Sequence, residues 1–140
     1  INYCTHMFVI KNKYFLIIEN IKDIDLKNLK KRNKFCIILR NKNYKESMRD
    51  LLDFRRNCKL KSIQFFVANN IKLAIQLNSD GIYLSAFNKT LKPLCFKKHN
   101  FEIIGSAHNL RELIIKIKQG CSVILFSKLF VVDYDKQAPN

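Results

Sequence analysis

The stretch FFVANNIKLAIQLNSDGIYLSAFN, residues 65–88, decides the fold class, because it carries two apolar runs with a short amphipathic segment between them. Both runs are continuous rather than alternating, which is typical of strands buried on both faces of a parallel sheet. The intervening segment, residues 70–78, places Ile71, Ala74 and Ile75 at helical spacing. This strand–helix–strand order predicts an α/β fold with a parallel sheet.

The same unit recurs along the rest of the chain. Apolar runs of strand length begin 18 to 28 residues apart, with polar segments of helical period between them. The runs are Phe15–Ile18, Phe35–Leu39, Ile63–Val67, Gly81–Leu84, Phe101–Ile104 and Val123–Phe126. The chain is therefore expected to alternate strands and helices from its first run to its last.

Two further segments predict helices that begin with a capping box. Asn43 with Glu46 marks the start of a helix over 43–58, and Asn109 with Glu112 marks the start of one over 109–119, which Gly120 ends. The expected apolar faces are Tyr44, Met48, Leu51 and Leu52, with Arg55 at the edge, in the first helix, and Leu110, Leu113, Ile114 and Ile117 in the second.

Repeats of about 20 residues suit the compact units of a (β/α)₈ barrel. Such a barrel needs eight units, whereas this chain of 140 residues has room for about six. A doubly wound open sheet of six strands would be complete at this length, so the repeat alone leaves both architectures open. We expect a single domain over residues 1–140, and because Met7 opens the segment MFVIKNKYFLII we expect residues 1–6 to be non-native upstream residues.

The composition points away from a polyanion-binding protein despite a formal charge of +15. Of the 26 cations, 20 are Lys, and Lys, Asn, Ile and Phe together make up 64 of the 140 residues, so a bias toward A/T-rich codons accounts for most of the excess charge. Neither an aromatic platform nor an arginine-rich strip for nucleic acid is evident. The chain also lacks an apolar stretch of about 20 residues, so we expect no membrane span.

The five cysteines favour a reduced, cytoplasmic protein. No two of them are separated by two residues, which excludes the zinc-knuckle and redox spacings, and their number is odd. Only three glycines are present, which excludes a glycine-rich nucleotide loop.

Candidate site residues follow the strands, because ligands of parallel α/β proteins meet the carboxyl ends of the strands. Arg40 and Lys42 lie two residues apart after the second run and suit a diphosphate group, although two solvated cations would give the same pattern. Ser106 and Ala107 lead into a helix start, where backbone amides can hold an anion. His108 follows as a candidate general acid or base, with no partner identifiable from the sequence.

At these residues the chain resembles thiamine phosphate synthase. FCIILRNK at 35–42 is similar to the family's Q-L-R-x-K diphosphate signature, and residues 65–88 resemble its I-I-N-D-R stretch followed by A-D-G-V-H-L-G-Q-x-D. IIGSAHNLRELIIKIKQGCSVILFSKLF at 103–130 is similar to its I-I-G-x-S-x-H, helix and A-D-Y-I-x-x-G-P-I-F. Four motifs occur in order over nearly the whole chain.

The resemblance implies a (β/α)₈ barrel, here shortened to about six units, that joins hydroxymethylpyrimidine diphosphate to thiazole phosphate with the help of magnesium. It places Arg40 and Lys42 at the diphosphate, Ser106 (or Ala107, since the loop is one residue shorter) at a phosphate, and Lys136 near a further phosphate-binding lysine. The expected partners are small phosphorylated substrates. A shortened barrel would also leave open sheet edges through which copies of the chain could associate.

The chain departs from the family where the metal binds. The two magnesium aspartates of the family fall on Asn69 and Asn88, which can offer oxygens but no charge. Two readings of the resemblance therefore stay open. One is a synthase-like transferase with a weakened metal site. The other is a thiazole tautomerase-like or catalytically degenerate paralogue that binds thiazole phosphate without the aspartates and in which His108 could transfer protons. A basic nucleic-acid-binding module is the third and weakest hypothesis.

Overall fold

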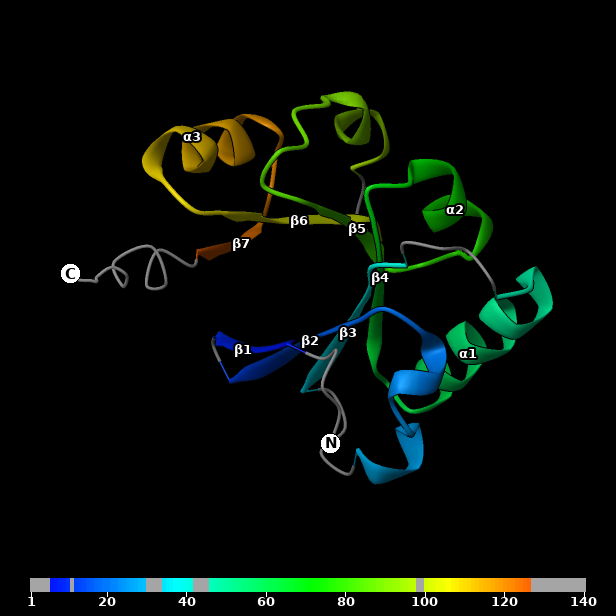
Figure 1. The fold of residues 1–140 in the computed structure, drawn as a ribbon. Helices are drawn as coiled ribbons and strands as arrows, with labels where there is room; N and C mark the ends of the chain where they lie inside the picture. Colours follow the sequence, from blue (N-terminus) through cyan, green and yellow to red (C-terminus); the bar gives the residue numbers. More distant parts are fainter. Residues whose placement is uncertain (1–5, 11, 30–33, 42–45, 98–99, 127–140) are drawn as a thin grey trace. The chain divides into compact units, whose positions relative to one another are not determined.

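The computed structural model describes residues 6–10, 12–29, 34–41, 46–97 and 100–126 (Figure 1). The chain divides into two compact units, residues 1–82 and 83–140, and each is described by itself. Strands and helices alternate in both units, which confirms the predicted α/β class.

Four neighbouring strands form the sheet of the first unit, in chain order. They are β1 (His6–Ile10), β2 (Lys13–Ile18), β3 (Phe35–Leu39) and β4 (Gln64–Ala68). β1 and β2 form an antiparallel hairpin, whereas β3 runs parallel to β2 and β4 parallel to β3. β1 was not expected from the sequence. The sequence signal for it is an asparagine, Asn12, between two apolar runs. In the structure Asn12 adopts a left-handed φ of 66°, as hairpin turns require.

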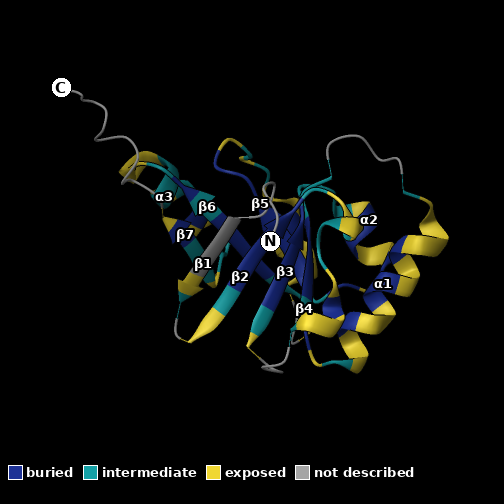
Figure 2. Cartoon of the chain, turned by 60° about the horizontal axis from the view of Figure 1, so that its bottom comes forward, coloured by how far each residue is buried: buried dark blue, intermediate teal, exposed yellow. Residues whose placement is uncertain are grey.

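The strand centres form the core of this unit, as the continuous apolar runs predict. Residues 15–18 of β2, 36–39 of β3 and 65–67 of β4 are buried along their whole length. Figure 2 shows these strands in dark blue, with α1 exposing its outer side. Burial of consecutive residues means that both faces of each strand are covered, which is the property of a parallel α/β sheet.

Helix α1 (Met48–Leu60) begins later than predicted. Ser47 caps it, since its Oγ accepts a hydrogen bond from the Asp50 backbone N at 3.1 Å. The predicted cap, Asn43, lies outside the described residues. The predicted apolar face is partly wrong, because Met48 and Leu52 are exposed. The side chains of α1 that are buried are Leu51, Phe54, Arg55 and Cys58.

A largely buried ion pair joins α1 to the turn before β5 (Gly81–Leu84). Arg55 Nη1 lies 3.3 Å from Asp80 Oδ2, and Arg55 Nε donates a hydrogen bond to the Asn78 carbonyl oxygen at 2.9 Å. Asp80 Oδ2 also accepts from the Phe65 backbone N at 2.8 Å. The pair therefore ties the helix, the turn and the start of β4 together. The predicted helix over 70–78 is present as the short helix α2 (Ile71–Gln76), which Asn70 caps and which lies between β4 and this turn.

The second unit continues from β5 through the 3₁₀ turn η3 (Lys92–Phe96) to β6 (Glu102–Ala107), α3 (Leu110–Lys118) and β7 (Val123–Phe126). β7 runs parallel to β6. The predicted start and end of α3 are confirmed, because Asn109 accepts from the Glu112 N at 2.9 Å and Gly120 has a left-handed φ of 87°. Glu112 does not return a bond to Asn109, as a capping box would, but accepts from the backbone N of His108.

The predicted buried face of α3 is wrong. Leu110 and Ile117 are 69% and 60% exposed, whereas Lys116 and Gln119 are fully buried. Helical period alone favours burial of the apolar stripe. Here the opposite side faces inward, because the two polar side chains find backbone carbonyl acceptors in the loop after β5.

The strand count also differs from the prediction. The described residues contain seven strands, one more than expected, because β1 precedes the first predicted run. All six predicted strands are present within two residues of their expected starts and three of their expected ends. The described part of the chain has too few strands for a complete eight-stranded barrel.

Candidate functional site

In the first unit, two predicted site residues follow neighbouring parallel strands. Arg40 comes directly after β3, and its backbone N donates to the Ile18 carbonyl oxygen of β2 at 2.8 Å. Asn69 comes directly after β4 and has a left-handed φ of 62°. Because β3 and β4 are parallel, both residues lie at the carboxyl edge of this sheet, where the sequence places them. Their side chains are partly exposed, so a ligand could reach them.

Glu46 organises the loops around Arg40, a role that the sequence did not indicate. One carboxylate oxygen accepts from the Asn41 side-chain Nδ2 at 2.7 Å, and the other accepts from the Ile21 backbone N at 2.6 Å. Glu46 therefore connects the loop after β2 with the residue next to Arg40. Its spacing from Asn43 had suggested a helix cap instead. Lys42, the predicted partner of Arg40, lies outside the described residues.

In the second unit, Asn88 lies in the loop after β5 and is held through its backbone. Its N donates to the Ser85 carbonyl oxygen at 2.9 Å, and its side-chain Oδ1 accepts from the Thr90 N at 3.0 Å. Its own carbonyl oxygen accepts from Lys116 Nζ at 2.9 Å and from Gln119 Nε2 at 2.8 Å. The conformation of the loop at this candidate metal position thus depends on two buried side chains, that of Lys116 in α3 and that of Gln119 directly after it.

Ser106 is the better placed of the two phosphate candidates in β6. Its side chain is partly exposed, whereas Ala107 is fully buried. The hydroxyl of Tyr83 in β5 donates to Ser106 Oγ at 2.8 Å, which orients the serine. Tyr83 was not predicted as a site residue, since it lies inside an apolar run. Tyr83 lies one residue before the end of its run, and in a parallel sheet the carboxyl ends of neighbouring strands lie close together. This position is the signal that could have indicated a contact with another site residue.

His108 has a partner that the sequence analysis did not identify. Glu112 Oε1 lies 3.3 Å from His108 Nδ1 and 2.8 Å from the His108 backbone N. The imidazole is 43% exposed, at the carboxyl end of β6. A carboxylate on Nδ1 orients the ring, which is the arrangement of an oriented acid–base histidine. The i, i+4 spacing of the two residues is the signal that could have revealed the pair.

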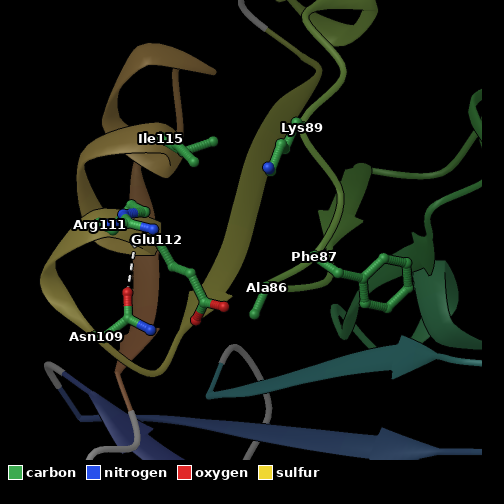
Figure 3. Close-up of a pocket in the computed structure, with 7 residues that line it drawn as sticks. All are labelled: Ala86, Phe87, Lys89, Asn109, Arg111, Glu112 and Ile115. Carbon is green, nitrogen blue, oxygen red and sulfur yellow. Dashed lines mark hydrogen bonds between the residues drawn. The ribbon is translucent and has the colours of Figure 1, made fainter.

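A pocket of about 420 Å³ lies between the loop after β5 and the start of α3 (Figure 3). Its lining combines both charge signs with apolar side chains. The lining residues are Ala86, Phe87, Lys89, Asn109, Arg111, Glu112 and Ile115. The close-up shows the Glu112 carboxylate directed toward Ala86, while Phe87 points away from α3.

The thiols of the buried Cys58 and the partly buried Cys121 are unreactive. Burial raises the pKa of Cys58 to about 12, with the charge of Arg55 opposing the shift and that of Asp80 adding to it. Burial likewise raises the pKa of Cys121 to about 11, against the charges of Lys116 and Lys97. Neither thiol is a nucleophile at neutral pH. Among the described residues, no group of three His, Cys, Asp or Glu side chains could hold a metal ion.

The model of the thiamine monophosphate synthase family matches residues 8–139. The chain belongs to this family. A search of curated proteins finds no match. Among solved structures, the fold is similar to that of a thiamine phosphate pyrophosphorylase from Pyrococcus furiosus, with a TM-score of 0.53 and 21% sequence identity. The likeness covers 66% of this chain and 46% of that chain.

Membership of this family confirms the resemblance seen in the sequence, and the structural likeness supports a barrel-type α/β fold. The chain spans about half the length of the solved relative. Lys136 lies outside the described residues, so its predicted contact stays a prediction. Every helix in the described part of the chain falls short of the length and apolar character that a membrane span requires.

Proposed function

We propose that this chain acts in thiamine biosynthesis as a synthase-like transferase that joins hydroxymethylpyrimidine diphosphate to thiazole phosphate. The family match over residues 8–139 carries the proposal. In the reaction, the thiazole nitrogen attacks the pyrimidine methylene carbon. A C–N bond forms while the C–O bond to the diphosphate breaks, and the diphosphate leaves with the electron pair.

The proposed roles follow the carboxyl ends of the strands. Arg40 binds the diphosphate through its planar guanidinium, and Lys42 and Lys136 add cationic contacts where the family resemblance puts them. Ser106, oriented by Tyr83, donates to a phosphate oxygen. The four free cysteines among the described residues suit the cytoplasm, where we place the activity.

The donor set in this chain does not suit the magnesium ion that the family uses. Mg²⁺ is normally bound through one or two carboxylates, whereas Asn69 and Asn88 supply neutral amides. The Asn88 Oδ1 atom already accepts from the Thr90 N, and the Asn88 carbonyl oxygen accepts from the Lys116 ammonium. The proposed reaction therefore uses no metal ion, and the cationic side chains must stabilise the leaving diphosphate.

The test is formation of thiamine phosphate from the two phosphorylated precursors, followed by oxidation to a fluorescent thiochrome. Arg40→Ala is expected to weaken binding of the pyrimidine diphosphate at least tenfold, because a charge-assisted hydrogen bond contributes about 1.5–3 kcal/mol. Arg49→Ala is the matched control, since Arg49 is an exposed arginine at the start of α1. Absence of product together with absence of binding of either precursor would refute the proposal.

The His108–Glu112 pair favours a second candidate, a thiazole tautomerase-like activity. Moving a proton within a thiazole ring requires an acid–base group rather than a metal ion, and an oriented histidine is such a group. The test is isomerisation of the thiazole carboxylate phosphate in the presence of a chelator. His108→Gln is expected to abolish this activity, and Glu112→Gln to reduce it while changing its pH profile. Turnover of the thiazole without coupling would select this candidate over the transferase.

A further inference from the structure

The second unit contains a lysine whose side chain is shielded from water. Lys116 is fully buried in α3, next to a helix face that leaves Leu110 and Ile117 in solvent. Moving an ammonium group out of water is strongly unfavourable unless hydrogen bonds and charges compensate for the lost hydration. Because Lys116 is buried while Ile117 is exposed, the ammonium group must have specific hydrogen-bond partners.

Those partners are backbone carbonyls of one loop. Lys116 Nζ lies 3.3 Å from the Ala86 oxygen and 2.9 Å from the Asn88 oxygen. Gln119 Nε2 lies 2.8 Å from the oxygens of both Asn88 and Thr90. Within the described part of the chain, no carboxylate lies at ion-pair distance from Nζ. Carbonyl oxygens converging on a positive charge are the arrangement by which loops bind cations.

Gly105 provides the space for this contact. A Cβ at position 105 in β6 would lie 2.7 Å from Lys116 Cδ and 3.0 Å from the Leu84 carbonyl oxygen. The aliphatic part of Lys116 thus passes directly over the glycine to reach the loop. Burial lowers the pKa of Lys116, while the charges of Cys121 and Glu112 act in the opposite direction. Gly105 on β6 and Gln119, the residue after α3, together accommodate the lysine.

We propose that the Lys116 ammonium, assisted by Gln119, is a built-in cation that fixes the loop of residues 86–90 and takes the place of a divalent metal ion there. Lys116 is a positioning residue, since its ammonium acts through the carbonyl oxygens of the loop. The positive charge that Lys116 holds at the Asn88 carbonyl oxygen repels a divalent cation near this loop and attracts an anion. Its metal-replacing role rests on the proposed function. Its role in fixing the loop of residues 86–90, called the clamp below, does not.

The first experiment measures hydrogen exchange of the loop amides by mass spectrometry. Asn88 and Thr90 are the reporters, because their N–H groups donate within the loop. Lys116→Met keeps the length of the side chain but removes the ammonium, and it is expected to raise exchange in peptides covering 86–91 at least tenfold. Lys118→Met is the matched control, since Lys118 is exposed on the same helix. Equal exchange in both variants and the wild type would overturn the clamp.

A second variant covers the case in which Lys116→Met does not fold. Gln119→Leu removes the two bonds donated by Nε2 and keeps the charge of Lys116. Gln119 Oε1 is buried without a hydrogen-bond partner among the described residues, so leucine leaves no additional side-chain atom unsatisfied. Loop exchange is expected to rise severalfold in this variant. Exchange like that of the wild type would also count against the clamp.

The second experiment separates charge from structure by measuring the affinity for inorganic diphosphate with magnesium and with a chelator. The wild type and Gln119→Leu are expected to bind with less than a threefold difference between the two conditions, and Lys116→Met to lose at least tenfold in the chelator. Binding by the wild type that requires magnesium would overturn the metal-replacing role. If the wild type binds no diphosphate in either condition, the proposed function and that role fail together, while the exchange experiment still decides the clamp.

Discussion

Replacing Asp80 by asparagine is expected to destabilise the first unit because it leaves the buried Arg55 guanidinium without its counter-charge. Arg55 is 8% exposed, and its Nη1 lies 3.3 Å from Asp80 Oδ2. The same oxygen accepts a hydrogen bond from the Phe65 backbone N at 2.8 Å. Asp80→Asn therefore removes an ion pair and weakens a hydrogen bond at the start of β4, with almost no change in side-chain volume.

The expected magnitude follows from the exposure of the two partners. Breaking a fully buried pair costs about 3–5 kcal/mol. The Asp80 side chain is 33% exposed, so water reaches one partner and the cost falls to about 2 kcal/mol. For a chain of this size, that corresponds to a fall in melting temperature of roughly 8 °C.

The assay is urea and thermal unfolding followed by circular dichroism, with a double-mutant cycle that adds Arg55→Met. The matched control is the exposed pair between Arg56 Nη1 and Asp53 Oδ1, which are 2.8 Å apart with side chains 67% and 54% exposed. Asp53→Asn is expected to cost less than about 0.5 kcal/mol. A coupling free energy for Arg55 and Asp80 no larger than that of the exposed pair would refute the reasoning.

Three further predictions concern thiols, pH and metal binding. Cys95 is exposed and is expected to react with an alkylating reagent before the buried Cys58. The rise of the Cys58 pKa from 9.0 to about 12 cuts its thiolate fraction at pH 7 about 1000-fold, and timed mass spectrometry would detect the difference. Burial lowers the folded-state pKa of Lys116, so the unfolded chain binds more protons than the folded chain between that lowered value and 10.5. The free energy of unfolding relative to Lys116→Met should therefore rise with pH in this window, and a fall would contradict the burial of the lysine. Asn69→Asp combined with Asn88→Asp is expected to tighten magnesium binding in calorimetry, and an unchanged affinity would mean that the two side chains do not face one site.

The strands could be predicted because their signal is local. Runs such as Phe35–Leu39 are apolar without interruption, and only a strand buried on both faces uses consecutive apolar residues in this way. The start of α3 at Asn109 and its end at Gly120 were equally local, since capping depends on one side chain and one backbone angle. β1 was missed because it is the edge strand of a hairpin whose turn residue, Asn12, is not accompanied by glycine.

The candidate site was predictable only in part. Arg40, Asn69, Asn88, Ser106 and His108 lie after or at the ends of strands, as a parallel α/β fold requires. The residues that orient them were not identified. Tyr83 lies inside an apolar run, Glu46 had a plausible capping role, and Glu112 was assigned to the cap of α3. The Tyr83 and Glu46 contacts join residues far apart in the sequence, and the Glu112 contact could not be distinguished from its simpler capping role.

The sequence by itself determined the α/β class, the six predicted strands, the ends of α3 and the resemblance to the thiamine monophosphate synthase family. Tertiary structure alone decided which face of α3 is buried. The apolar stripe predicted one face, and the opposite one is buried because carbonyl oxygens of the loop after β5 compensate for desolvation of Lys116 and Gln119. Hydrophobic burial depends on area and can be read from periodicity, whereas a buried charge depends on acceptors that only the folded chain assembles.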